Sequence, residues 1–236
     1  MLIQTAVHRN AFHPAPKSAR GVAPVSTRTA KGGHEPLTQT MHLMGAVMSH
    51  SRNSEIFGEV EPAEYLYKVM SGCVRTYKTL NDGRRQISGF YLPGEVFGLS
   101  FDDEHTVSAE AIADSKVLVI KRSAIDALAG RDPSIARELF TLTGRELRRA
   151  QDRIVLLIKS AQERVAGFLL EMADRTSAAT AVELPMSRQD IADYLGLTIE
   201  TVSRTLTALE CSAAIGLPSS RHIVLRNRAQ LHRIVS

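Results

Sequence analysis

The chain has 236 residues, of which 44% are hydrophobic and 23% are charged, a composition that fits a soluble globular protein. Its apolar runs are far shorter than the roughly 18 residues of a membrane span, so no membrane partner is expected. The cysteines Cys73 and Cys211 are isolated. They form no zinc or iron–sulfur ligand pattern, and they suit a reducing cytosol. The net charge of +4 favours an anionic partner only weakly. We expect no metal and no other cofactor.

Residues 1–40 contain His, Pro, Ala, Ser, Thr and Gly without a period, and we expect a disordered tail there. Residues 1–34 hold five Lys and Arg and no Asp or Glu. The opening stretch MLIQTAV is too short to be the apolar centre of a secretory signal. A mitochondrial transit peptide would also be basic and poor in acids, and it stays the alternative interpretation of this segment.

The next part of the chain carries the pattern of short strands separated by turns. The stretches 64–72 (EYLYKVMSG), 73–80 (CVRTYKTL) and 84–92 (RRQISGFYL) are rich in β-branched and aromatic residues. The second and third of these flank Asn81-Asp82-Gly83, a hairpin turn that can adopt positive φ. Two more strands are expected within 106–122 (TVSAEAIADSKVLVIKR). Short strands at this spacing predict a β-sandwich or β-roll.

A long helix is predicted from Asp132-Pro133 onward, because Pro is favoured at the first position of a helix. An apolar heptad series runs along it, made of Phe140, Thr143, Leu147, Ala150, Ile154, Leu157 and Ala161. This series favours a two-helix dimer interface, with Phe140, Leu147, Ile154 and Leu157 as its apolar members. Alternatively, the stripe packs on its own domain. Another amphipathic helix is expected over 161–175.

The C-terminal segment has the pattern of a winged helix-turn-helix. Ser187 with Asp190 three residues on predicts a helix start, Gly196 ends that helix, and Thr198 caps the next one. Two short strands around Pro218-Ser219-Ser220 would form the wing. The predicted fold is therefore α+β. Its segments are a tail (1–40), a β-roll (41–131), a dimerisation helix (132–160) and a winged helix-turn-helix (161–236).

The second helix of this motif presents candidate base-reading residues. If Val202, Leu206 and Leu209 form the buried stripe, the outward positions are Glu200, Ser203, Arg204 and Thr207. Glu200 and Arg204 lie four residues apart, so an ordinary surface ion pair is the simple interpretation. In this motif, however, the first turns of the second helix enter the major groove. Arg can bind guanine, Glu can accept from cytosine, and Ser can bond either kind of group.

Other residues near this helix are candidates for contacts to the DNA backbone or for the wing: Ser187, Arg188, Thr198, Thr201 and Arg221. Cys211 lies at the predicted end of the reading helix. It is either an ordinary exposed or space-filling thiol or a redox switch, because an oxidised sulfur acid near phosphates would repel DNA. Ala213 stands where a glycine would be the usual helix cap.

The stretches EPAEYLYKVMSGCVRTYKTLNDGRRQISGFYLPGEVFGL and LPMSRQDIADYLGLTIETVSRTLTALE resemble the FixK subgroup of the CRP/FNR superfamily of bacterial transcription regulators, over about residues 40–230. The resemblance implies a homodimeric, non-enzymatic activator that binds palindromic TTGAT…ATCAA targets and contacts RNA polymerase in the bacterial cytoplasm, associated with the nucleoid. It implies a link to low-oxygen genes. It also implies that Arg204 reads the guanine, Glu200 the complementary cytosine and Ser203 the thymines.

The chain departs from this family at three places. One is Ala213, where the family often has glycine, and we expect a less regular exit turn there. FNR senses oxygen with an N-terminal cysteine cluster, and no cysteine lies in this N-terminus. Members that bind cyclic nucleotides have Phe-Gly-Glu and Arg-Ser, where this chain has Phe97-Gly98-Leu99 and His105-Thr106. The ribose carboxylate and the phosphate cation are therefore missing, and we expect no cAMP binding. A regulator that depends on a cyclic nucleotide or another small ligand is the alternative.

Two further hypotheses concern partners and catalysis. The acidic loop Asp102-Asp103-Glu104 is either a solvated loop or a contact for a sigma factor. A cupin-like enzyme would need a His/Glu metal cluster, whereas His42, His50 and His105 are scattered without the required spacing. No catalytic residue is therefore predicted.

Overall fold

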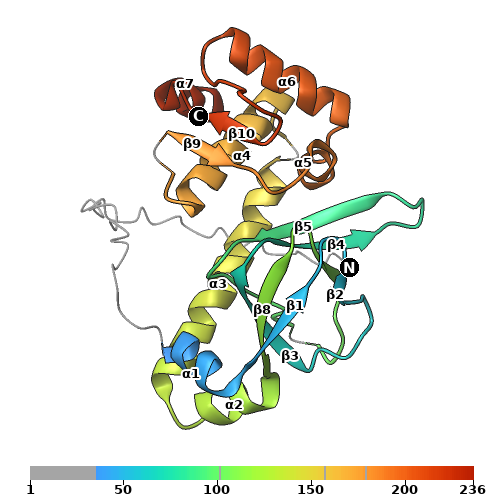
Figure 1. Cartoon of the computed structure of the whole chain (residues 1–236), viewed down its shortest axis with the longest axis vertical. Helices are drawn as coiled ribbons and strands as arrows, with labels where there is room; N and C mark the ends of the chain where they lie inside the picture. The colour runs from blue at the N-terminus through green and yellow to red at the C-terminus, as the bar shows by residue number, and fades with distance from the viewer. Residues whose placement is uncertain (1–35, 101, 157, 179) are drawn as a thin grey trace, which may run out of the picture. The chain divides into compact units, whose positions relative to one another are not determined.

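The computed structural model describes residues 36–100, 102–156, 158–178 and 180–236 (Figure 1). Its N-terminal part consists of α1 (Pro36–Met44), β1 (Ala46–His50), β2 (Glu55–Phe57), β3 (Tyr65–Ser71), β4 (Val74–Thr79), β5 (Arg85–Tyr91), β6 (Val96–Phe97), β7 (Ser108–Ala111), β8 (Ser115–Lys121), α2 (Arg122–Ala129) and α3 (Pro133–Leu156). Its C-terminal part consists of α4 (Ala161–Arg175), β9 (Ala181–Glu183), α5 (Arg188–Leu195), α6 (Ile199–Cys211), β10 (His222–Val224) and α7 (Arg228–Val235). The predicted α+β class is confirmed.

The strands of the N-terminal part form two antiparallel four-stranded sheets, in the orders β1-β8-β3-β6 and β2-β7-β4-β5. Aromatic and β-branched side chains fill the space between them, among them Phe57, Tyr67 and Phe97. The predicted hairpin is confirmed, since β4 and β5 pair around a turn in which Gly83 has φ +81°. Glycine suits that position because other residues are strained at positive φ.

The structure differs from the sequence prediction at the start of the chain. Residues 36–40, assigned to the disordered tail, form the first turns of α1. Leu37 and Met41 lie one helical turn apart, and both are fully buried in the cluster that also holds Leu118 of β8 and Ile135 of α3. Burying each such side chain is worth roughly 1.5–3 kcal/mol, which fixes a helix too short to be stable alone. Residues 1–35 lie outside the described residues.

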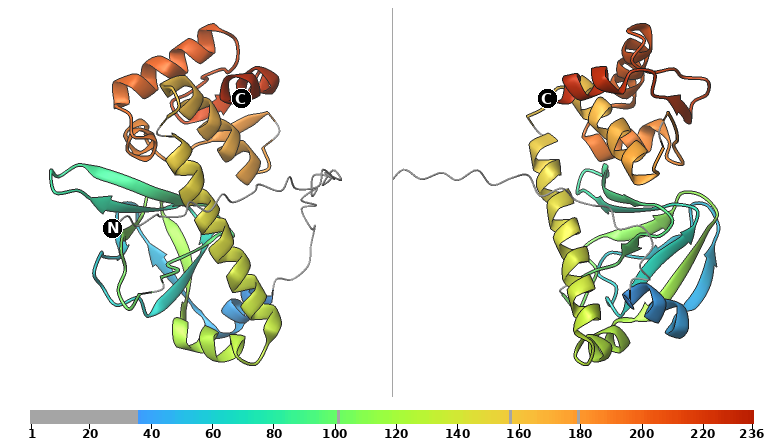
Figure 2. Two further views of the ribbon diagram at one scale, coloured as in Figure 1. Left: turned by 180° about the vertical axis from the view of Figure 1, so that it is seen from behind. Right: turned by 90° about the vertical axis from the view of Figure 1, so that its left-hand side faces the viewer.

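Helix α3 begins at Pro133, as predicted, and covers the β-roll with one of its faces. Ile135 is buried, and Leu139 and Leu142 are partly buried against the roll. Farther along, the Tyr91 hydroxyl of β5 donates to Glu146 (3.2 Å). Figure 2 shows α3 beside the strands from two directions. The helix ends at Leu156, and Ser160 caps α4 with a full capping box.

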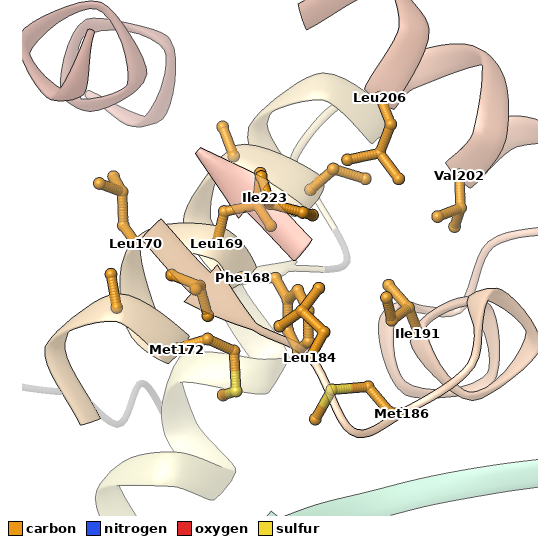
Figure 3. Packing of buried hydrophobic residues seen from close by; sticks show 14 of the residues in the cluster. Phe168, Leu169, Leu170, Met172, Leu184, Met186, Ile191, Val202, Leu206 and Ile223 are labelled. Atoms are coloured by element: carbon orange, nitrogen blue, oxygen red, sulfur yellow. The ribbon is translucent and has the colours of Figure 1, made fainter. Parts of the chain in front are cut away.

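The C-terminal part packs around the buried apolar side of α4. Figure 3 shows Phe168, Leu169 and Met172 of α4 among the apolar side chains of the following elements. The remaining labelled members are Leu170, Leu184, Met186, Ile191, Val202, Leu206 and Ile223. The same cluster continues into the β-roll through buried residues such as Ile87 and Phe90 of β5. Among the described residues, no helix is both long and apolar enough to cross a membrane.

Candidate nucleic-acid interface

The first helix of the motif, α5, is held at both ends by the predicted signals. Ser187 and Asp190 form a complete capping box, in which the Ser187 hydroxyl accepts from the Asp190 amide (3.1 Å) and the Asp190 carboxylate accepts from the Ser187 amide (2.9 Å). Gly196 ends the helix in the left-handed conformation, with φ +64°. A residue with a side chain would be strained there, so the sharp turn into α6 requires glycine.

The second helix, α6, begins where the sequence predicts. The Thr198 hydroxyl accepts from the amide of Thr201 (3.2 Å), which satisfies one of the unpaired amides of the first turn. Val202, Leu206 and Leu209 are buried, and they fix which side of the helix faces the core. The opposite side carries Glu200, Ser203, Arg204 and Thr207, and we name it the reading face after its predicted role. All four of these residues are exposed.

The reading face carries one charge of each sign, on Glu200 and on Arg204. A hydrogen bond from its own backbone amide, followed by one from Thr198, holds the pKa of Glu200 below its usual range, and the positive charge of Arg204 adds a smaller lowering. Glu200 is therefore an acceptor at neutral pH. In the described part of the chain, Arg204 makes no ion pair closer than 4.0 Å. Its guanidinium is therefore free to bind an external group.

The five residues predicted to contact the DNA backbone or to form the wing lie in different settings. Ser187 and Thr198 use their hydroxyls in the two caps, and the Thr201 hydroxyl lies 3.1 Å from that of Thr198. Arg188 is half-buried at the start of α5, and burial lowers its pKa. Arg221 lies beside β10 at the wing, where its carbonyl accepts from the Leu184 amide (2.8 Å). Thr198 and Thr201 therefore lie together at the start of α6, and Ser187 and Arg188 lie at the start of α5.

The wing departs from the predicted pair of strands around Pro218-Ser219-Ser220. Only the second strand, β10, forms, and its partner is the distant β9. On the near side, Gly216 makes a single bridge to Val224. The physical reason is that β9 offers three paired residues, whereas Pro218 lacks an amide and cannot extend a ladder.

The C-terminal end of α6 carries the two other residues that the sequence singled out. Cys211 is the last residue of the helix and is exposed, about 10 Å along the helix axis from Arg204. Ala213 follows the cap and takes φ +57°, the left-handed conformation that favours glycine. The predicted irregularity of this exit turn is therefore present as backbone strain.

A small cavity of about 160 Å³ lies between the β-roll and α3, where the cyclic-nucleotide motifs of the family would meet. It is lined by Gly98, Leu99 and His105 from the roll and by Glu146 and Arg153 from α3. His105 is buried and stacks on Phe57 at 3.7 Å, and burial lowers its pKa. The guanidinium of Arg153 donates to the carbonyl oxygen of Ser88, so a side chain of the protein itself enters this space.

One candidate reading residue was missed by the sequence analysis. Ile199, the first residue of α6, is 37% exposed beside Glu200. Its position in the sequence could have identified it, because Ile199 is in the first turn of α6 but outside the buried stripe of Val202, Leu206 and Leu209. Apolar side chains at such places can contact thymine methyl groups.

Comparisons with known proteins agree with this architecture. The Crp-like helix-turn-helix domain matches residues 163–234, and the cyclic nucleotide-binding domain matches residues 47–132. The chain is 48% identical to the nitrogen fixation regulation protein FixK of Azorhizobium caulinodans, over 95% of this chain and 92% of that protein. It is 44% identical to FixK of Bradyrhizobium diazoefficiens, over 74% of this chain and 76% of that protein.

Among solved structures, FixK2 from Bradyrhizobium japonicum matches with a TM-score of 0.79 and 51% identity, over 82% of this chain and 98% of that chain. The extent of these matches covers both the β-roll and the helix-turn-helix. The chain therefore belongs to the FixK group of the CRP/FNR family of DNA-binding transcription regulators.

Proposed function

We propose that the protein is a homodimeric activator that reads TTGAT…ATCAA palindromes through the reading face of α6. The observation that supports this most directly is the state of that face. Glu200, Ser203 and Arg204 are exposed on the first turns of a helix whose other side is buried and capped. Arg204 would bind the guanine bidentately and Glu200 would accept from the paired cytosine, with Ser203 beside the thymines. Ile199 would add a thymine methyl contact.

The proposed dimer rests on a second exposed surface, the outer side of α3. The dimer stripe, defined as Phe140, Leu147 and Ile154, is 80%, 60% and 67% exposed, and Ile158, just beyond the end of the helix, is 88% exposed. Large apolar side chains in such a row favour a partner that covers them. The first three are spaced by heptads, which suits a second copy of the same helix. The own-domain alternative is disfavoured, because the roll is covered by another face of α3, with Ile135 and Leu139. Leu157 lies outside the described residues.

Two reading helices related by the dimer axis would meet half-sites about 34 Å apart, one turn of DNA. Arg188, Arg221 and the caps at Ser187, Thr198 and Thr201 would face the phosphates or support the residues that do. Phosphate contacts would make binding fall steeply with salt. The relatives named nitrogen fixation regulation protein FixK support a role at nitrogen-fixation genes. Other relatives, named as the activators Anr and AadR, support an activating role.

We propose RNA polymerase as a partner, because activation requires it. We also propose that the protein acts at the nucleoid in the bacterial cytoplasm. The acidic loop at 102–104 remains a candidate contact. Its backbone is fixed to the roll, since the Ala63 amide donates to the Asp103 carbonyl (2.7 Å) and Arg122 donates to the Asp102 carbonyl (3.1 Å).

The redox role of Cys211 also remains a hypothesis. Comparing the peroxide sensitivity of DNA binding in the parent chain with that in Cys211→Ser tests it.

The cavity at Arg153 bears on the alternative of a ligand-dependent regulator. Small-molecule sites enclose roughly 300–1,000 Å³, about twice or more the volume found here. We therefore propose that cAMP does not bind. A rise in melting temperature with millimolar cAMP would contradict this. The variant Arg153→Ala, in which the arginine side chain no longer occupies the cavity, is measured for comparison.

The most informative experiment is selection of bound duplexes from a random pool, with and without candidate effectors. The proposal predicts enrichment of a palindrome with TTGAT half-sites. Recovery of single, unpaired half-sites would contradict the dimer, and recovery of unrelated sequences would contradict the reading assignment. Ile154→Asp tests the stripe separately: sedimentation should give a monomer, whereas Asp152→Ala on the same helix should stay dimeric.

A further inference from the structure

We infer that Arg75 and Arg85, on the β4–β5 hairpin of the β-roll, are positioning residues for DNA reading. They hold helix α5 through two of its carboxylates and thereby set the direction in which α6 is presented. The ion-pair cluster that does this consists of Glu110, Arg75, Asp190, Arg85 and Asp193. The effect on DNA rests on the proposed function, whereas the mechanical part is tested without DNA.

Arg75 is the centre of the cluster. It is 7% exposed, a rare state for an arginine, and it lies between two carboxylates from different parts of the chain. One nitrogen is 2.5 Å from Asp190 of α5, and another is 2.9 Å from Glu110 of β7. A buried arginine in this arrangement fixes geometry well because its donors form a rigid fork.

Arg85, on the neighbouring strand, contacts the same helix from a second direction. It lies 3.0 Å from Asp190 and 3.0 Å from Asp193, and its side chain is 27% exposed. Asp193 also accepts from Gln189 (2.6 Å). Contacts at positions 190 and 193 are one helical turn apart, so they resist both sliding and rotation of α5.

Asp190 has two functions at once, and this connects the cluster to the reading helix. One of its oxygens, Oδ2, accepts from the amide and hydroxyl of Ser187 and starts α5. The other, Oδ1, faces Arg75 and Arg85. The carboxylate that begins the helix is therefore the same one that the β-roll holds.

Helix α6 follows α5 because the two are packed together through buried residues and joined by the Gly196 turn. Three aromatic rings also link α5 to the β-roll and to α4. The ring centroid of Tyr194 of α5 lies 5.2 Å from that of Phe90 of β5 and 5.8 Å from that of Phe168 of α4. Apolar packing alone tolerates small rotations, whereas paired charges specify one arrangement. Buried ion pairs are weak evidence for stability, and fixing a unique geometry is the use that we infer here.

The first measurement detects the orientation directly within one chain. A spin label at the exposed Cys211 reports on α6, and Lys116→Cys supplies a second label on β8. Cys73 does not compete, since it is fully buried and its thiol pKa is raised to about 12 by that burial. Labelled protein diluted in unlabelled protein gives the distance distribution between the two labels, independent of dimerisation and of DNA.

We expect a narrow distance distribution in the parent chain and a clear broadening in both Arg85→Met and Arg75→Met. Because the Arg85 side chain is partly exposed, the Arg85→Met variant should still fold. Arg85→Lys should restore much of the narrow distribution. The matched control is Arg228→Met, which removes the Arg228–Asp174 pair (2.6 Å) inside the C-terminal part. Distributions of equal width in Arg85→Met and the parent chain would overturn the inference, whatever the DNA preference of the protein.

The second measurement links orientation to reading. Palindromes with the half-sites one base pair closer or farther apart should be rejected by the parent dimer. With Arg85→Met, this spacing selectivity should fall by about fivefold or more, while base preference within a half-site stays the same. A uniform loss of affinity at every spacing would indicate stability alone and would contradict the positioning role. If the parent chain itself ignores TTGAT, the proposed function fails, and the spin-label result still decides the inference.

Discussion

The two helices of the helix-turn-helix differ in how their charged side chains are paired. On α5, the charges that face the β-roll are buried and paired, as Asp190 is with Arg75 and Arg85. On α6, Glu200 and Arg204 are exposed, and Arg204 has no ion pair within 4.0 Å among the described residues. Buried ion pairs fix the position of the helix that carries them, whereas exposed, unpaired charges are available to bind a ligand. We therefore expect substitutions of the buried, paired residues to change stability and substitutions of the exposed residues to change DNA selectivity.

The largest expected effect comes from breaking the buried side. Arg75→Met leaves Glu110 and part of Asp190 without their partner, and we expect the free energy of unfolding to fall by about 3 kcal/mol or more. Arg228→Met, whose partner Asp174 is 66% exposed, should cost less than about 1 kcal/mol. Urea unfolding measures both, and equal losses in the two variants would show that burial makes no difference here.

The next effect concerns the open side. Arg204→Ala should remove about 1–3 kcal/mol of discrimination at the guanine of each half-site, since one bidentate contact is lost. The melting temperature should stay unchanged, because the side chain is exposed and unpaired. Fluorescence anisotropy with duplexes changed at that base measures the preference. Full retention of the preference would mean that another residue reads the guanine. The matched control is Arg145→Ala, which removes an exposed arginine on α3.

A smaller effect tests the strained end of the reading helix. Ala213→Gly should stabilise the protein by about 1 kcal/mol, because glycine adopts the left-handed conformation without the clash of a Cβ atom. Ala208→Gly, inside the exposed part of α6, should instead destabilise by about 1 kcal/mol. Thermal unfolding compares the two variants. The same sign in both would rule out backbone strain as the cause.

The smallest effect sharpens the distinction between reading and general attraction. Arg221→Ala at the wing should weaken binding to all sequences alike, without changing base preference. The slope of log affinity against log salt should become less negative by about 0.9 for each protomer that loses a phosphate contact. Titrations at several salt concentrations check this slope. A change in base preference with Arg221→Ala would place the wing among the reading elements instead.

Local signals in the sequence predicted the reading helix well. Ser187, Gly196 and Thr198 are each sufficient to place an end of a helix, because capping and positive φ are properties of one residue and its near neighbours. The same holds for the Asn81-Asp82-Gly83 hairpin. The wing was predicted less well, since β10 pairs with β9, about 40 residues away, and such a partner leaves no mark in a short window.

The order of the elements, the exposed face of α6 and the apolar stripe of α3 can be predicted from the sequence, because periodicity and caps depend on neighbouring residues. Three features depend on contacts between distant residues. Leu37 and Met41 turn part of the predicted tail into a helix, and one face of α3 covers the roll while its dimer stripe stays exposed. Arg75 contacts Asp190, 115 positions away in the chain. A charge does not reveal its partner in sequence. The pairing arises only when folding removes both groups from water and makes an unpaired state costly.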